Sequence, residues 1–405
     1  MIGSLYTGIS GLKANAMAMS IIGDNIANVN TTAFKCGRAL FSTMLNQSLK
    51  GYNESEVGRG VQFSGSSPLW QQGTLENTES GTDLAITGRG FFMVQDESGA
   101  NYYTRAGQFH FDRNGNLVTP GSLAVQGYEL ALDGTAGAIT DINIPDESTT
   151  TPNATTLFSI NFNLDSGAEA GDEYTTTLIT YDSLGNEIPL TMTFTKTATA
   201  NQWDWEADTS ATGAHVTTGS GTITFDDDGT LLTGSDPTIT LTFTNGAATP
   251  QDITWDLYDD AGVTNGDVTG YASSSSATFQ TQDGYPSGTL KSIVVDKDGI
   301  INGSYSNGQI IPLFQIALAD FPSYWGLAKM ENNLYTQTFA SGQAMIGTAG
   351  NGRMGSINSK ALETSNVDLT SEFVKMITTQ RAYQANSKVI TTTDEILSEL
   401  INIKR

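Results

Sequence analysis

Two histidines, one cysteine and many carboxylates are the side chains from which catalysis could be built in this 405-residue chain. His110 and His215 lie in strand-like or loop-like segments, and no nucleophile motif stands beside either of them. The sequence has no G-x-S-x-G, no H-E-x-x-H, no phosphate-binding loop and no Cys–His arrangement. Cys36 is the single cysteine, so no intramolecular disulfide can form. We therefore predict that the chain is not an enzyme.

Acidic pairs offer the remaining route to catalysis. Asp204 and Glu206 alternate with Trp203 and Trp205, so glycosidase carboxylates beside a sugar-stacking surface are one interpretation. A strand that packs both tryptophans inward explains the same alternation more simply. In a chain this acidic, most carboxylates belong to a solvated surface, and we prefer the second interpretation.

A recurring pattern places Gly three residues after Asp. None of these stretches continues as a calcium-binding loop that ends in a glutamate at its twelfth position. We interpret them as hairpin turns, in which Asp accepts a hydrogen bond from its own turn and Gly supplies a positive φ. We predict no metal site and no cofactor. The turns are Asp96–Gly99, Asp112–Gly115, Asp182–Gly185, Asp226–Gly229, Asp259–Gly262 and Asp296–Gly299.

The net charge of −24 is unevenly distributed. Residues 1–50 carry four basic groups and one acidic group, and residues 358–405 carry six of each sign, so residues 51–357 hold −27. This acidic middle lacks the basic face that a nucleic-acid-binding protein needs. No run of about 18 apolar residues is present, so we predict no membrane insertion. The N-terminus lacks the features of a secretory signal, which by itself predicts a cytoplasmic protein unless export uses another route.

The two ends of the chain carry apolar residues at alternating steps of four and three. Such spacing lays one narrow stripe along a helix and predicts that this helix packs on another helix. Periodic apolar residues are also typical of ordinary core helices, and four glycines weaken the first helix, so it needs a partner to form. We predict that the stripes form an assembly interface between copies of the chain. Its residues are Leu5, Ile9, Leu12, Ile26, Leu369, Phe373, Met376, Tyr383, Ile390 and Leu397.

Between these helices, short apolar or alternating segments separated by Gly, Ser, Thr and Asn predict many β-strands. Two polar runs, near residues 146–157 and at Ser273–Ser276, bracket a block of strands. The predicted fold class is multidomain and mainly β with α-helical termini. Its terminal helices form a coiled-coil-like base, and a discontinuous inner β domain carries an inserted outer β domain. The predicted segments are 1–30 with 366–405 (helical), 31–72 with 359–365 (extended linking chain), 73–145 with 285–358 (inner) and 146–284 (outer).

Three segments resemble signatures of the axial rod and hook proteins of the bacterial flagellum. They are GDNIANVNTTAFK at 23–35, TGRGFF with YTRAGQF in 87–109, and LETSNVDL with MITTQRAYQAN in 362–386. The segments occur in the order of the family and cover both ends and the inner β domain. Ala33 departs from the pattern, because the family usually has Gly before this Phe. The motif residues are Asn25, Asn28, Asn30, Phe34, Asn366, Asp368, Gln380 and Arg381.

The resemblance implies a structural subunit of a helical homopolymer. Rod members are typically shorter and lack so large an inserted domain, which favours a hook subunit that forms a flexible curved tube. The tube would act as a universal joint that transmits torque from rod to filament. The implied partners are further copies of the chain, the rod and hook–filament junction proteins, the hook cap during assembly and the type III export apparatus. The implied location is the extracellular hook, reached without a cleaved signal peptide.

Two alternatives remain open at this point. A distal rod protein would share the terminal helices and motifs but would form a rigid shaft. A secreted carbohydrate-binding β protein would need no terminal helices and would bind as a monomer with both ends removed. For the polymer, we expect the terminal helices to be largely disordered in the monomer and to fold on assembly. We also expect the polar, acidic β domains to slide against their neighbours as the tube bends.

Overall fold

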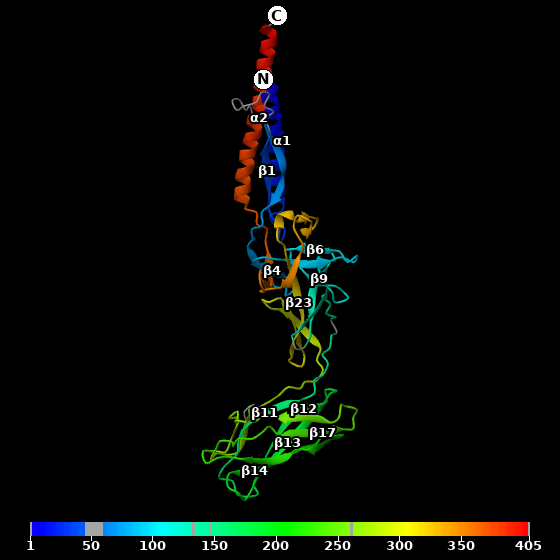
Figure 1. Ribbon diagram of the computed structural model, residues 1–405, viewed down its shortest axis with the longest axis vertical. Coiled ribbons are helices and arrows are strands. Elements are labelled where there is room, and N and C mark those ends of the chain that lie inside the picture. The colour runs from blue at the N-terminus through cyan, green and yellow to red at the C-terminus, as the bar shows by residue number, and fades with distance from the viewer. Residues whose placement is uncertain (1, 45–59, 132–133, 146–147, 260–261, 404–405) are drawn as a thin grey trace. The chain divides into compact units, whose positions relative to one another are not determined.

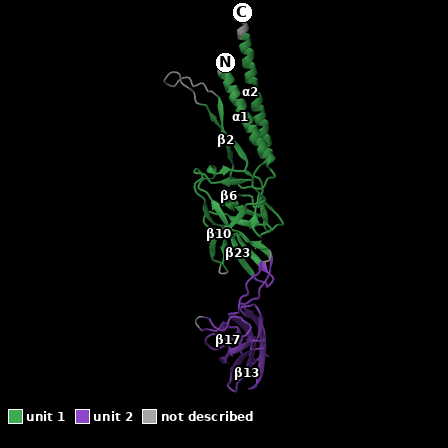
Figure 2. Cartoon of the chain, turned by 90° about the vertical axis from the view of Figure 1, so that its right-hand side faces the viewer, with its two compact units in different colours: residues 1–146, 292–303, 310–405 green, residues 147–291, 304–309 purple. Residues whose placement is uncertain are grey.

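The computed structural model describes residues 2–131, apart from 45–59, then 134–145, 148–259 and 262–403 (Figure 1). The chain divides into two compact units (Figure 2). Unit 1 comprises residues 1–146, 292–303 and 310–405, and unit 2 comprises residues 147–291 and 304–309. The predicted fold class is confirmed, because the chain is mainly β and has two terminal helices that contact each other.

The two helices of unit 1 are α1 (Ile2–Ala27) and α2 (Leu369–Ile403), which lie side by side in both views. Gly8 and Gly11 allow their close approach. A Cβ atom on Gly8 would lie 2.9 Å from Cγ1 of Ile390, and one on Gly11 would lie 2.7 Å from Nδ2 of Asn386. The interior glycines that weaken α1 as an isolated helix therefore let it pack closely against α2.

Asp368 caps the start of α2. The carboxylate of Asp368 accepts hydrogen bonds from the backbone N–H groups of Thr370, at 2.8 Å, and Ser371, at 3.3 Å. Asp368 therefore satisfies two of the donors that the first helical turn leaves without a partner. Glu372 lies in the same turn, where a negative charge favours the helix dipole.

A pair of antiparallel strands, β1 (Gly37–Thr43) and β2 (Val61–Pro68), packs along α1. The backbone N–H of Val61 donates to Oγ of Ser10 at 3.2 Å, which fixes the start of β2 on the helix. The extended linking chain predicted for residues 31–72 thus contains strands that pair with each other. Residues 1, 45–59, 132–133, 146–147, 260–261 and 404–405, which belong to predicted segments, lie outside the described residues.

The largest sheet in the described residues has twelve strands, eight of them in the order β21-β22-β23-β9-β5-β6-β25-β24. Its core holds Phe91, Tyr103, Phe321 and Tyr335, with Trp70 packed against them. These eight strands are Leu290–Val295, Ile300–Tyr305, Ile310–Asp320, Ala124–Leu130, Phe91–Gln95, Asn101–Thr104, Leu334–Thr336 and Ala328–Lys329. The others are β7 (His110–Phe111), β8 (Leu117–Val118), β10 (Ala136–Asp141) and β26 (Met345–Thr348).

Two short antiparallel pairs connect the early and late parts of unit 1. Strand β3 (Leu75–Asn77) pairs with β28 (Ala361–Glu363), and β4 (Leu84–Thr87) pairs with β27 (Ser356–Ser359). A 3-10 helix, η1 (Tyr324–Gly326), follows β23. These pairs bring the chain that leaves α1 beside the chain that leads into α2.

Unit 2 contains two sheets that share one hydrophobic core. The rings of Phe162 and Phe194 lie 4.7 Å apart, and Trp205 meets Trp255 edge to face at 5.4 Å. The first sheet has β11 (Leu157–Asn163), β15 (Ala214–Thr218), β17 (Thr238–Phe243), β18 (Gln251–Trp255), β19 (Val268–Thr269) and β20 (Ser276–Gln282). The second has β12 (Glu173–Tyr181), β13 (Glu187–Lys196), β14 (Gln202–Thr209) and β16 (Ser220–Thr224).

Strand β14 decides between the two interpretations of the Trp-Asp-Trp-Glu alternation. Trp203 and Trp205 are buried in the core of unit 2, while Asp204 and Glu206 are exposed. The inward packing of the tryptophans is therefore confirmed. Neither tryptophan is available to stack on a sugar.

The Asp-to-Gly stretches form the predicted turns, apart from Asp259–Gly262, in which residues 260–261 lie outside the described residues. In the turn at Asp182, the carboxylate accepts hydrogen bonds from the backbone of Leu184 and Asn186 at 2.9 and 2.8 Å. Gly185 has a φ of 82°, and the glycines of the other turns also have positive φ values. The side-chain amides of Asn186 and Asn245 donate two further hydrogen bonds to the carboxylate of the buried Asp182. Because these hydrogen bonds favour the charged form, they lower the pKa of Asp182 although burial acts in the opposite direction.

The two stretches that lead into and out of unit 2 run beside each other. The backbone N–H of Thr150 donates to the carbonyl of Gly288 at 2.9 Å, and that of Leu290 donates to the carbonyl of Ser148 at 3.0 Å. In the part of the chain that the structure describes, neither helix has an apolar stretch long enough to cross a membrane.

Candidate assembly interface

The N-terminal motif begins with Asn25, which is buried at the end of α1. Its Oδ1 accepts a hydrogen bond from the N–H of Gly37 at 2.7 Å, and its Nδ2 donates to the carbonyl of Gly37 at 2.8 Å. The same Nδ2 donates to Oε2 of Glu372 at 3.1 Å. One side chain thereby joins the last turns of α1, the start of β1 and the first turn of α2.

The C-terminal motif residue Asn366 makes the equivalent connection from the other side. Its Oδ1 accepts from the N–H of Cys36 at 2.8 Å, and its Nδ2 donates to the carbonyls of Leu69 and Gln71 at 2.9 and 3.0 Å. Its backbone N–H donates to the carbonyl of Phe34 at 3.3 Å. These bonds satisfy backbone groups of two segments that no regular ladder covers at this point.

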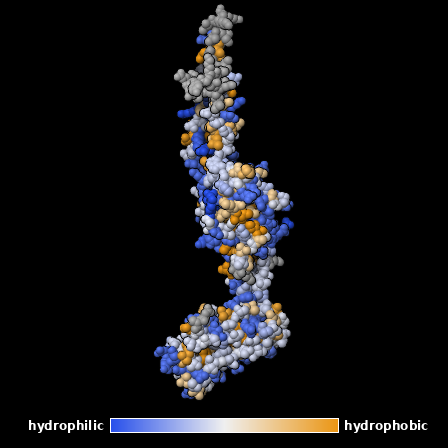
Figure 3. Space-filling model, viewed as in Figure 1, coloured by the Kyte–Doolittle hydropathy of each residue, from blue (hydrophilic) through white to orange (hydrophobic). Residues whose placement is uncertain are grey.

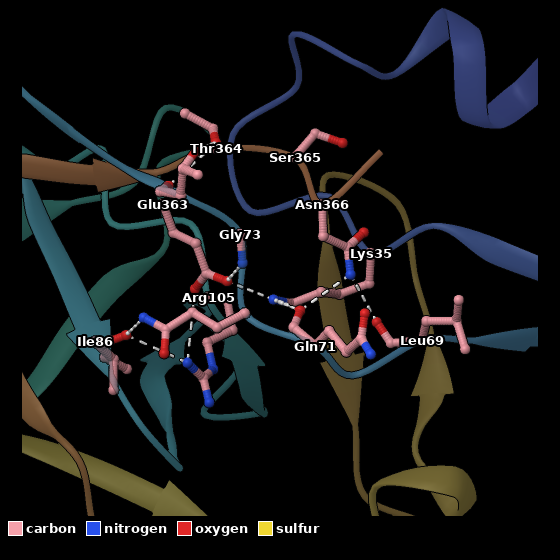
Figure 4. A network of polar contacts seen from close by, with 12 residues as sticks. Lys35, Leu69, Gln71, Gly73, Ile86, Arg105, Glu363, Thr364, Ser365 and Asn366 are labelled. Carbon is pink, nitrogen blue, oxygen red and sulfur yellow. Dashed lines mark hydrogen bonds and ion pairs between the residues drawn. The ribbon is translucent and has the colours of Figure 1, made fainter. Parts of the chain in front are cut away.

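Beside Asn366 lies a cluster of buried charges, Lys35, Arg105 and Glu363 (Figure 4). The ammonium of Lys35 donates to Oε1 of Glu363 at 2.5 Å and to the carbonyl of Gln71 at 2.9 Å. The guanidinium of Arg105 lies 3.6 Å from Oε2 of Glu363. It also donates to the carbonyls of Ile86 and Gly88, at 3.4 and 2.7 Å.

The electrostatics of this cluster are those of two buried cations that share one buried anion. Lys35 is 4% exposed, Arg105 is 6% exposed and Glu363 is fully buried. Burial lowers the pKa of Lys35, and the contact with Glu363 acts in the opposite direction. Burial also lowers the pKa of Arg105, again against the attraction of Glu363. Glu363 is therefore the group that lets both cations stay buried in charged form.

Ala33 lies in a turn two residues before Lys35, and Cys36 directly follows Lys35. Ala33 has a φ of 58°, in the left-handed region that favours glycine, and its N–H donates to the carbonyl of Glu363 at 2.7 Å. This geometry gives a physical reason for a glycine at that position. Cys36 is buried, and burial raises the pKa of its thiol, so it is a weak nucleophile.

The predicted stripe residues lie partly open along the helix pair. Leu5, Leu12, Ile26, Met376, Ile390 and Leu397 are half-buried, while Ile9, Leu369, Phe373 and Tyr383 are exposed. The fully buried face of α1 is instead a row of small residues and its continuation, at Gly8, Gly11, Ala14, Ala18, Ile22 and Asn25. The sequence carried a signal for this face, because these positions are also separated by three or four residues.

An apolar groove lies between α1 and the β1–β2 pair. Its volume is about 850 Å³, and its lining includes Tyr6, Ile9, Met17, Met44 and Phe63. Tyr6 and Met17 are exposed in the single chain. The helical part of unit 1 thus presents apolar surface on two sides, along the predicted stripes and in this groove.

Four family models match consecutive parts of the chain. They are "Flagella basal body rod protein" at 5–35, "Flagellar hook protein FlgE/F/G D1 domain" at 85–162, "Flagellar basal body protein FlaE D2 domain" at 163–285 and "Flagellar basal body rod FlgEFG protein C-terminal" at 358–403. The flagellar hook protein FlgE of Salmonella typhimurium is 37% identical over 99% of this chain and 100% of its own length.

The chain belongs to the flagellar hook protein family. The hook protein of Escherichia coli K12 is 36% identical over 98% of both chains, and that of Borreliella burgdorferi is 35% identical over the whole of both. The crystal structure of the Helicobacter pylori flagellar hook protein FlgE2 matches with a TM-score of 0.55 at 16% identity. The match covers 71% of this chain and 100% of the Helicobacter chain, and it supports the fold alone. The chain is a structural subunit of the bacterial flagellar hook.

The remaining motif residues of this hook protein occupy different surroundings. Asn28 is half-buried, donates to Asp24 and accepts from the hydroxyl of Thr31 at 3.0 Å, so it shapes the end of α1. Phe34 is buried beneath the ammonium of Lys329, which lies 4.7 Å from the ring centroid. The side chains of Asn30, Gln380 and Arg381 are exposed. The roles of these exposed residues in assembly stay a prediction.

Proposed function

We propose that this hook subunit polymerises through its terminal helices into a flexible curved tube that transmits torque from rod to filament as a universal joint. The proposal is carried by one observation, the apolar surface that the helix pair leaves open. Tyr6, Met17, Phe373 and Ile377 are large, apolar and exposed on helices that already contact each other. A helical array of identical heterologous contacts would cover this surface and would propagate without closing.

The outer part of the subunit would stay on a solvated exterior. Unit 2 carries twenty acidic and two basic residues, a net charge of −18 over residues 147–291 and 304–309. Its visible face in Figure 3 is mostly pale or blue, with scattered orange residues. Like-charged, polar surfaces slide past one another more readily than interlocked apolar surfaces, which suits a tube that bends as it rotates. Charge reversals in unit 2 that left hook bending unchanged would contradict this point.

The partners and location follow from the same proposal. Copies of the chain would form the tube, rod and hook–filament junction proteins would bind its two ends, and the hook cap would act during assembly. Export through the type III apparatus, without a cleaved signal peptide, would deliver the subunit outside the cell.

Hydrogen exchange and circular dichroism on the purified monomer and on the assembled polymer test the proposal. We expect protection of residues 2–27 and 369–403 to rise strongly on polymerisation, because their apolar stripes then gain partners. Full protection of both helices already in the monomer, unchanged by assembly, would mean that the helix pair is an ordinary core. A straight, inflexible polymer would indicate a rod-like shaft instead of a joint.

A further inference from the structure

Two large aromatic side chains of unit 1 are mostly exposed in the part of the chain that the structure describes. Phe339 is 105% exposed, which is at least the exposure of an extended peptide, and Trp325 is 61% exposed. Trp325 belongs to η1, and Phe339 belongs to the loop that follows β25. Exposed aromatics of this size are typical of the centre of a protein–protein contact.

The two segments are held against each other at the residues beside these aromatics. The hydroxyl of Thr338 donates to the carbonyl of Gly326 at 2.5 Å. A Cβ atom on Gly326 would lie 2.3 Å from the carbonyl carbon of Ala340, so the two backbones are in direct contact. The buried Ser341 accepts from the N–H of Thr338 and donates to its carbonyl, both at 2.9 Å. The aromatics therefore project from a braced loop that loses little freedom on binding.

The inward side of the same segment is packed into the core. The ring of Tyr324 lies 5.4 Å from Trp70 and 5.2 Å from Phe91. Its neighbour Trp325 points away from this cluster, because its side chain remains mostly exposed. The two segments that carry these aromatics contain no charge of their own, since residues 321–328 and 334–352 contain no Asp, Glu, Lys or Arg.

We propose that Trp325 and Phe339, called here the aromatic patch, bind a second copy of this chain and form a contact between neighbouring inner β domains. The proposal rests on the polymer described under Proposed function. Among possible occupants, a second copy is favoured by charge. Unit 2 carries −18, so two copies repel each other there, whereas residues 321–328 and 334–352, which carry the patch, add no charge to that repulsion. Unit 1 also carries the terminal helices, so their association would bring inner β domains close together.

Four serine variants of the full-length chain test the proposal. Trp325→Ser and Phe339→Ser remove the patch, Tyr6→Ser weakens the helical surface, and Phe279→Ser is a matched control because Phe279 is 60% exposed in unit 2. The critical concentration for polymerisation is measured by sedimentation at fixed ionic strength. We expect each patch variant to raise it about tenfold or more, and Phe279→Ser to leave it within about twofold.

Two further measurements separate binding from folding and from the helical contact. Thermal unfolding of the patch variants should match the parent chain, because exposed side chains contribute little to stability, and Phe339→Tyr should restore polymerisation. Patch variants that polymerise like the parent chain, while Tyr6→Ser fails, would overturn this inference and leave the proposed function standing. A rise for the patch variants with none for Tyr6→Ser would support the patch and count against the helical contact.

Discussion

Replacing Glu363 by Gln removes the single anion between two buried cations and changes the side-chain volume very little. Oε1 of Glu363 holds the ammonium of Lys35 at 2.5 Å and the N–H of Gly73 at 2.9 Å, and Oε2 faces Arg105 at 3.6 Å. At an effective dielectric constant of about 20, two unit charges 3.6 Å apart attract by about 5 kcal/mol. Desolvation offsets part of this attraction in the native pair, but the variant keeps the desolvation cost of Lys35 and Arg105 and loses the attraction to Glu363.

We therefore expect Glu363→Gln to destabilise this junction by about 3–5 kcal/mol, the range for breaking a buried ion pair. Amide hydrogen exchange in the monomer measures the effect locally. Useful reporters are the N–H of Leu69, which donates to Cys36, and the N–H of Thr364, which donates to Thr74, because neither contacts the altered side chain. Since about 1.4 kcal/mol corresponds to a factor of ten, their protection should fall by roughly a hundredfold or more.

Two control variants make the reasoning refutable. Glu76→Gln changes an exposed carboxylate on β3, opposite Leu362 of β28, and should leave protection nearly unchanged. Lys35→Met leaves Glu363 paired with Arg105 alone, so Glu363→Gln should cost less in that background. A loss of protection below tenfold for Glu363→Gln, or equal losses with and without Lys35, would refute the shared-anion account.

Gly8→Val should destabilise the helix pair by about 1–3 kcal/mol and raise the critical concentration for polymerisation, because even a Cβ atom at this position would lie 2.9 Å from Cγ1 of Ile390. Adding Ile390→Ala should recover part of the loss. An unchanged critical concentration in sedimentation would contradict the close helix crossing. Asp182 has a lowered pKa, so its contribution to the stability of unit 2 is present above about pH 4 and is lost as the pH falls through the folded value. Tryptophan fluorescence during urea unfolding should show this loss of stability between pH 6 and 2. The Asp182→Asn variant should be less stable than the parent chain at pH 6, and its stability should depend less on pH. Parallel pH profiles of stability for the variant and the parent chain would exclude Asp182 as the cause. Ala33→Gly should raise the free energy of unfolding by less than about 1 kcal/mol. Glycine removes the steric cost of the left-handed φ, but it also increases the conformational entropy of the unfolded chain, which offsets part of the gain. A clearly lower free energy of unfolding in urea would contradict this. Added salt should lower the critical concentration for polymerisation, because it screens the repulsion between neighbouring outer domains, each with a net charge of −18, beyond a distance of about 10 Å. An uncharged osmolyte is the control, because it gives no screening. A critical concentration that rises with salt would contradict the repulsion.

Much of the fold could be predicted from local patterns. The alternation of Trp203 with Asp204 and the Asp-to-Gly turns each depend on residues a few positions apart, and both are confirmed. The same locality explains why both terminal helices were found close to their observed bounds, Ile2–Ala27 and Leu369–Ile403.

Features that depend on distant residues could not be found in this way. Lys35 and Glu363 are 328 positions apart, and no periodicity connects them. The buried face of α1 was missed for a different reason. A search for large apolar residues selects Ile9 and Leu12, whereas close packing against α2 selects Gly8 and Gly11. The hydrophobic pattern thus found the edge of the contact, and the small residues mark its centre.

The adjacency of the two chain stretches that enter and leave unit 2 has a consequence for engineering. Because Thr150 bonds to Gly288 and Leu290 bonds to Ser148, the ends of this segment are already neighbours. Closing them with a short turn would cost little loop entropy, and a foreign domain whose termini lie close together could replace the whole segment. The chain could then serve as a display scaffold, in which the grafted cargo changes while the parts built from unit 1 keep their sequence.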